Sequence, residues 1–203
     1  MINTSLTFLN TVLNNFIALK DPFNSAGALT SPVILDNIVN QKSDLFHLGG
    51  DFVIMSLVNT EEETVGKVQL PYFKTADDKM SVVNPPIKLN LYIQFAAFSD
   101  TVVNNQSPYT RALKLLDQVV FFFQYRNVFA ANQYPLLQQG GVEKLIIEPV
   151  SLTFEQLNHL WATLGAKYLP SVVYKCRTLT YRETVVSPAM PLITELIADE
   201  TSI

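Results

Sequence analysis

The sequence is poor in the residues that most reactive sites and crosslinks use. Its 203 residues include one cysteine, Cys176, and two histidines, His47 and His159. A single cysteine cannot form a disulfide within the chain, so we expect folding in a reducing compartment. Cys176 lies in an alternating pattern typical of a strand and has no histidine near it in sequence. We therefore expect a buried structural thiol rather than a nucleophile.

Charge is also scarce. Charged residues make up 16% of the chain, against about 25% in average domains. The net charge is −4 and no cluster of Lys and Arg is present, which argues against a nucleic-acid partner. The one tight cluster of charge, residues 61–63, is expected to be a solvated loop. Hydrophobic residues reach 48%, which is compatible with a large core but favours a subunit that buries surface against neighbours.

The chain lacks the short motifs of the common enzymes. It has no G-x-S-x-G, no G-x-x-x-x-G-K-[ST] and no G-x-G-x-x-G. No pair of His, Cys or acidic residues has metal-ligand spacing. No residue near 61–63 or near Asp77 and Asp78 is of a kind that would shift the pKa of a carboxylate toward the value a general acid or base needs. We therefore expect no catalysis, no cofactor and no metal ion.

Long apolar runs are absent too. Residues 1–20 lack the basic start and continuous apolar stretch of a signal peptide. No run reaches the ~18 apolar residues that suggest a membrane span. We expect neither a leader nor membrane insertion.

What the chain does have is clear periodicity of apolar residues, which predicts helices and strands in mixed order. Helices are expected at 2–20, 107–125 and about 154–164, and strands at 32–40, 51–59, 87–98, within 138–152 and from about 170 to 183. Residues 60–86 are interpreted as a long loop, or an extended hairpin arm. The predicted fold is α+β: a mixed, mostly antiparallel sheet flanked by helices. It would occupy 1–183, followed by a tail at 184–203.

Several faces can be assigned from the same pattern. In 87–98, alternation places Leu91, Ile93 and Phe95 on one face and polar residues on the other. Residues 121–123 are three phenylalanines in a helix, so either one of them meets something beyond the nearest sheet or all three are core. Thr153 and Gln156 form a capping-box pattern, and Gly165 is a plausible C-terminal cap. The predicted buried face of this helix is Phe154, Leu157, Leu160, Trp161 and Leu164.

Two segments are candidate interfaces because they carry more apolar residues than a solvent-exposed loop or tail would be expected to carry. The loop or arm offers Val65, Val68, Leu70, Tyr72 and Phe73. The tail offers Leu192, Ile193, Leu196 and Ile197 at helical spacing after Pro191. Each segment could instead fold over its own domain.

A third hypothesis belongs to another functional class. Tyr92, Trp161, Tyr174 and Tyr181 could line an aromatic pocket in a small-molecule- or peptide-binding module without catalysis. Buried aromatics are, however, most often core.

Several segments carry a resemblance to a known family. They are "SLVNTEEE" (56–63), "PPIKLNLYIQFAA" (85–97), "ALKLLDQVVFFFQ" (112–124) and "VEKLIIEPVSLTFEQLNHLWATLGAKYLPSVVYKCRTLT" (142–180). In this order they resemble the N-terminal domain of the cap, or tail-terminator, proteins of extracellular contractile injection systems. These are phage-tail-like particles of the antifeeding-prophage and virulence-cassette type.

The resemblance implies a structural protein. Its members form a hexameric ring on the last layer of inner tube and sheath and stop polymerisation there. The implied partners are further copies of the chain, the inner tube protein, the sheath protein or a second cap paralogue. The implied location is the bacterial cytoplasm during assembly, then the particle, released or retained. Some relatives carry a longer C-terminal extension, whose role is not carried over to this chain.

Overall fold

The computed structural model describes residues 1–20, 31–39, 50–64, 72–74, 80–82, 87–102 and 105–181. In chain order the elements are α1 (Ile2–Lys20), β1 (Val33–Leu35), β2 (Asp51–Glu62), β3 (Tyr72–Lys74), β4 (Met80–Val82), β5 (Ile87–Ser99), α2 (Pro108–Tyr125), β6 (Val128–Ala130), the 3₁₀ helix η1 (Ala131–Gln133), α3 (Pro135–Gln139), β7 (Lys144–Val150), α4 (Phe154–Leu164) and β8 (Ser171–Tyr181). The α+β prediction is confirmed.

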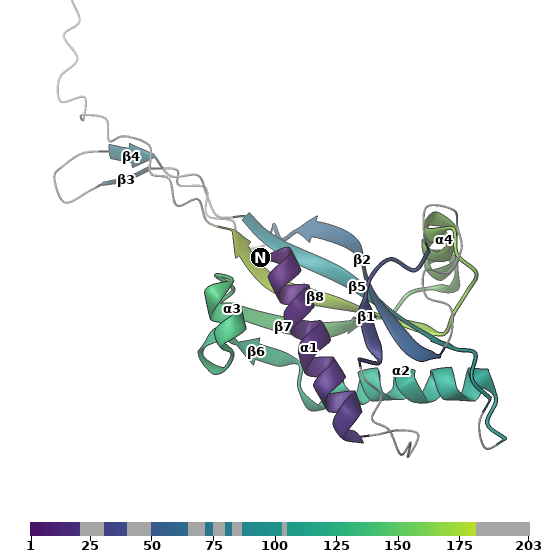
Figure 1. Ribbon diagram of the computed structural model, residues 1–203. Coiled ribbons are helices and arrows are strands. Elements are labelled where there is room, and N and C mark those ends of the chain that lie inside the picture. The colour runs from purple at the N-terminus through teal and green to yellow at the C-terminus, as the bar shows by residue number, and fades with distance from the viewer. Residues whose placement is uncertain are drawn as a thin grey trace, which may run out of the picture.

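Six of the described strands form one sheet in the order β1-β2-β5-β8-β7-β6. Only the β1–β2 pair is parallel; the other neighbours run antiparallel. β3 and β4 pair with each other in a separate two-stranded sheet, which Figure 1 draws beyond the N-terminal end of β5. This small sheet lies within the segment interpreted as a loop or arm.

The main core lies on one face of the sheet, where α1 and α2 cover it (Figure 1). Leu91, Ile93 and Phe95 of β5 point into this core and are fully buried, as their alternation predicts. Leu9 and Leu13 of α1 meet them there. Burying side chains of this size contributes roughly 1.5–3 kcal/mol each relative to exposure.

A second, smaller cluster covers part of the opposite face. Trp161 of α4 lies there over Phe52 and Ile54 of β2, together with Ala96 of β5. β2 is thus apolar on both sides near its start and covered on both. The capping box is also present: Thr153 Oγ1 accepts from the Gln156 amide at 3.2 Å, and Gln156 Oε1 accepts from the Thr153 amide at 2.9 Å.

The fold differs from the prediction in four places. β1 is shorter than the expected 32–40. The short elements β6, η1 and α3 were not predicted. The residue after α3 must be a glycine, Gly140, because a Cβ at that position would lie 2.5 Å from Thr4 Cγ2 of α1. Residues 61–62 belong to β2 rather than to a solvated loop. Phe154, predicted to be buried, is 93% exposed, because it lies in the first turn of α4, clear of the sheet.

α1 is tied to the sheet by an unusual polar contact. The Asn14 side chain donates from Nδ2 to the Val33 carbonyl at 2.9 Å and accepts from the Val33 amide at 2.7 Å. It therefore satisfies both backbone groups of one β1 residue, as a neighbouring strand would. The contact fixes the C-terminal half of α1 beside the sheet edge.

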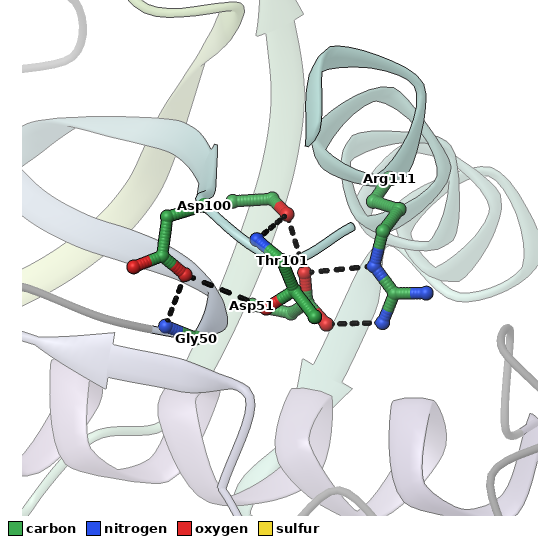
Figure 2. A network of polar contacts seen from close by, with 6 residues as sticks. Gly50, Asp51, Asp100, Thr101 and Arg111 are labelled. Atoms are coloured by element: carbon green, nitrogen blue, oxygen red, sulfur yellow. Dashed lines mark hydrogen bonds and ion pairs between the residues drawn. The ribbon is translucent and has the colours of Figure 1, made fainter. Parts of the chain in front are cut away.

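α2 is tied to the start of β2 by a buried ion pair (Figure 2). The Arg111 guanidinium contacts both carboxylate oxygens of Asp51, with Nε 3.1 Å from Oδ1, and both side chains are buried. Ser99 donates to the same carboxylate, and Asp100 accepts from the Gly50 amide at 2.6 Å. The network joins the β2 start, the β5 end and α2.

Arg111→Met is expected to destabilise the fold by about 3 kcal/mol, because it leaves the Asp51 carboxylate buried without its cation. Urea denaturation followed by circular dichroism measures the loss. The control is Glu155→Gln, which removes an exposed partner 3.7 Å from His159 and should hardly change the midpoint. Equal midpoints for both variants would show that the Arg111 pair does not stabilise the fold.

Candidate docking surfaces

The outer side of α2 exposes large apolar side chains near its C-terminal end. Phe122 and Phe123 are buried against the sheet, whereas Phe121 is 63% exposed and Tyr125 is 77% exposed. Successive residues of a helix are rotated by about 100°, so three consecutive side chains cannot all point to one face. Phe122 and Phe123 point to the inner face, and Phe121 points away from it. Of the two alternatives left by the sequence, the structure therefore selects the one in which a phenylalanine projects beyond the core.

Phe121 faces α1 across a groove. One hollow has a volume of about 670 Å³ and is lined by Phe16 and Lys20 of α1 and by Gln118, Phe121 and Tyr125 of α2. A second hollow of about 260 Å³ shares Phe16 and Tyr125 with it and extends to Leu19 and Arg126. Because the two hollows share lining residues, we treat them as one feature, the α1–α2 groove.

The charged residues that line the α1–α2 groove, Lys20 and Arg126, are both cations. Lys20 Nζ lies 5.8 Å from the centre of the Phe16 ring, and Arg126 Cζ lies 6.0 Å from that of Tyr125. Both cations stand at helix C-termini, where they are favourably placed against the helix dipole. None of the described lining residues is acidic. The lining of the groove thus combines aromatic and apolar side chains with two cations.

The opposite face of the sheet has a different character. Tyr92 donates its hydroxyl proton to Glu61, and Lys175 Nζ lies 3.8 Å from the same carboxylate. Arg177 contacts Glu63 at 3.7 Å and Glu148 at 3.3 Å. The hydrogen bond to Glu61 raises the pKa of the Tyr92 phenol above its ordinary value. We call these six residues the polar face; each partly exposed pair contributes little stability, but together they make this side hydrophilic.

The predicted aromatic pocket is not assembled. Tyr174 lies in the main core, 4.7 Å from Phe123 between ring centres, whereas Tyr92 lies on the other side of the sheet. Trp161 is buried and contacts Tyr168 at 5.6 Å between ring centres. A hollow of about 460 Å³ between α4 and the sheet includes Tyr92 but none of the other three in its described lining. The Tyr181 side chain lies outside the described part.

Among the described residues, the candidate reactive groups Cys176 and His159 lie apart, one in the main core and one exposed on α4. Cys176 is fully buried, and burial raises the pKa of its thiol to about 12. His159 lies exposed on α4, while His47 falls outside the described residues. Within the described ranges, no group of three His, Cys, Asp or Glu residues could hold a metal ion. Nor is any helix in those ranges long and apolar enough to cross a bilayer.

The interface residues predicted from the sequence fall almost entirely outside the described structure. Tyr72 and Phe73 belong to the backbone of β3. Val65, Val68 and Leu70 of the arm, and Leu192, Ile193, Leu196 and Ile197 of the tail, lie outside the described residues. The α1–α2 groove was not predicted. The signal for it was Phe121, the first of three consecutive phenylalanines, together with the near absence of charge in α1.

One family model matches most of the chain. The model of the Pvc16 N-terminal domain family matches residues 6–195. Comparison with curated proteins gave no match. Among solved structures, the chain is similar to the sheath/tube terminator of an extracellular contractile injection system, PVC, in its extended state, with a TM-score of 0.53 and 12% identity over 96% of this chain. It is also similar to the tube-terminating cap of the anti-feeding prophage, with a TM-score of 0.51 and 14% identity over 92% of this chain.

The two structural relatives are longer proteins. The match spans 63% of the PVC terminator and 59% of the anti-feeding prophage cap. At these identities the similarity establishes a shared fold.

Phe121→Ala should leave the free energy of unfolding within about 1 kcal/mol of the parent, because the side chain is mostly exposed, whereas Phe123→Ala should cost about 3–5 kcal/mol. Denaturant titration of the two variants measures the difference. A large loss from Phe121→Ala would mean that this ring is part of the core and not of a docking surface.

Native Cys176 should resist alkylation at pH 8, because its raised pKa leaves only about one thiol in 10⁴ ionised and the side chain is enclosed. Mass spectrometry after treatment with iodoacetamide is the measurement. Unfolding in guanidinium chloride should give full labelling within minutes. Rapid labelling of the folded protein would contradict the buried assignment.

Proposed function

Because the chain belongs to the Pvc16 N-terminal domain family, we propose that it is a structural cap of a contractile phage-tail-like injection system. In this proposal it binds the finished end of the inner tube and sheath, stops their polymerisation and stabilises the particle. No catalytic step is required for this role.

The observation that carries the proposal is the extent of the structural similarity. The PVC sheath/tube terminator matches 96% of this chain, helices and strands together. The anti-feeding prophage cap, described as a tube-terminating cap, matches nearly as much. Both relatives terminate filaments, and the family match covers the same region.

The surfaces of the molecule suit such a role. A terminator needs one surface that is complementary to the filament end or to its neighbours, and another that does not offer a matching site for the next layer. The α1–α2 groove and the polar face differ in this way: the groove is lined by apolar residues and two cations, whereas the polar face carries several ion pairs. The low share of charged residues also reduces the cost of desolvating the first of these surfaces.

We further propose that six copies form a closed ring. Contacts in a cyclic oligomer are heterologous, since one patch of each subunit meets a different patch of the next. The arm residues 65–73 and the tail residues 192–197 are proposed to supply contacts to neighbouring copies, tube or sheath. Assembly would take place in the bacterial cytoplasm, and the ring would then remain part of the particle.

The location of the chain on the particle tests the proposal. An epitope-tagged chain, detected by immunogold electron microscopy of purified particles, should be found at a single end. Particles from an untagged strain are the control for stray gold. Labelling along the whole sheath, or only on material detached from particles, would contradict a terminal cap.

A further inference from the structure

The first turn of α4 presents an aromatic ring and a carboxylate that are complementary to the α1–α2 groove. Phe154 is 93% exposed, and the exposed Glu155 follows it in the chain. The groove is lined by aromatic rings and by two cations, namely Phe16, Phe121, Tyr125, Lys20 and Arg126. We propose that the groove of one copy binds Phe154 and Glu155 of the next copy. The inference deepens the proposed ring and rests on it.

The exposure of Phe154 has no explanation within its own copy. The cap of α4 is made by Thr153 and Gln156. The apolar contact beside that cap is made by Leu152 and Leu157, which line one hollow and stand at the positions of a hydrophobic staple. Phe154 is not needed for either, and phenylalanine has no helix propensity that would favour it there. A ring so exposed is covered by no part of its own copy, so any cover must come from another molecule.

Phe154 and the groove of the same copy lie on different sides of the subunit. α4 covers the face of the sheet opposite to α1 and α2. Figure 1 shows α4 at the upper right, whereas the C-terminal ends of α1 and α2 meet near the bottom. Contacts in a cyclic oligomer need two different patches on each copy, because one patch meets the other patch of the neighbour. The groove and the first turn of α4 form such a pair.

The two patches match in chemistry. The larger hollow of the groove, about 670 Å³, exceeds the size of one phenyl group, so part of the α4 turn can enter with the ring. Aromatic pairs in edge-to-face or offset contact gain free energy beyond their area of burial. Glu155 would then approach Lys20, which lines the same hollow. Within its own copy Glu155 has the exposed His159 at 3.7 Å, a contact that contributes little and is easily exchanged.

A second copy accounts for both exposed patches at once. In a closed ring, each copy would offer Phe154 to one neighbour and its groove to the other, so that neither patch stays in water. Tube or sheath protein bound in the groove would leave Phe154 uncovered. Exposed apolar patches mark interaction sites, and the opposite charges of the two patches favour pairing them with each other.

Disulfide trapping in cells tests the inference. Gln118 lines the groove, and Asn158 is exposed one turn after Phe154 on the same side of α4. An epitope-tagged full chain with Gln118→Cys and Asn158→Cys replaces the parent, and intact cells are treated with a mild oxidant. The native Cys176 is buried and does not interfere. On non-reducing gels we expect a ladder of tagged bands beyond the dimer, because each copy would link to two neighbours.

Matched variants of the trapping chain sharpen the result. Asp117→Cys in place of Gln118→Cys should give no ladder above background, since residue 117 is exposed and rotated by about 100° from residue 118. Phe154→Ala should lower the yield roughly tenfold, because aromatic anchors dominate interfaces. Tyr109→Ala, which removes a ring that is 61% exposed in the first turn of α2, should not. The thermal midpoint of Phe154→Ala should equal that of its parent, which separates loss of contact from loss of fold.

A charge exchange tests the pairing of Glu155 with Lys20. Lys20→Glu and Glu155→Lys should each lower the yield of the ladder roughly two- to fivefold. The two changes together should restore it, because they exchange the charges across the contact. A purely structural role of either residue would give no such rescue.

The inference is overturned by a ladder no stronger than that of the Asp117→Cys control, or by one that Phe154→Ala leaves unchanged. A tagged band that contains a different protein in place of a second copy would also overturn it, since the groove would then have another occupant. Gold labelling of particle ends scores the proposed function separately. End-labelled particles without trapping would discard this inference alone, and trapping without end labelling would discard the cap.

Discussion

The alternation of side chains along β5 is the constraint on which the rest of the fold depends. β5 lies inside the sheet, between β2 and β8, and its odd-numbered residues 91–95 are fully buried apolar side chains. Helices must cover that face, and both α1 and α2 do. The two helices meet at an angle near their C-terminal ends (Figure 1), and the α1–α2 groove lies where they meet. Phe16 lines the groove and packs against the core, whereas Phe121 lines it and is exposed.

The even-numbered residues of β5 account for the other side of the molecule. Asn90 and Tyr92 reach the carboxylates at the end of β2, with Asn90 Nδ2 3.0 Å from Glu63. The basic residues of β8 complete these contacts. α4 covers only the part of this face where β2 and β5 turn apolar, at Phe52, Ile54 and Ala96. The polar face and the apolar cluster are therefore consecutive stretches of the same strands.

Much of this could be predicted from local patterns and part could not. The long strands and helices were predictable because their periods are clear over many residues, and Thr153 and Gly165 mark the ends of α4 by their own chemistry. β6 and α3 are too short to show a period. Phe154 fits a helical stripe, yet it is exposed because the sheet lies under only part of α4. The partners of Asn14 and Arg111 are distant in sequence, and the groove depends on the relative placement of two helices, which no single segment specifies.

The central proposal is that this chain ends a filament. The most direct measurement is the length distribution of particles from a strain that lacks it, recorded by electron microscopy beside the parent strain. We expect overlong, variable or absent tails, with parental length restored when the chain is supplied again. Particles of normal and uniform length without the chain would contradict it.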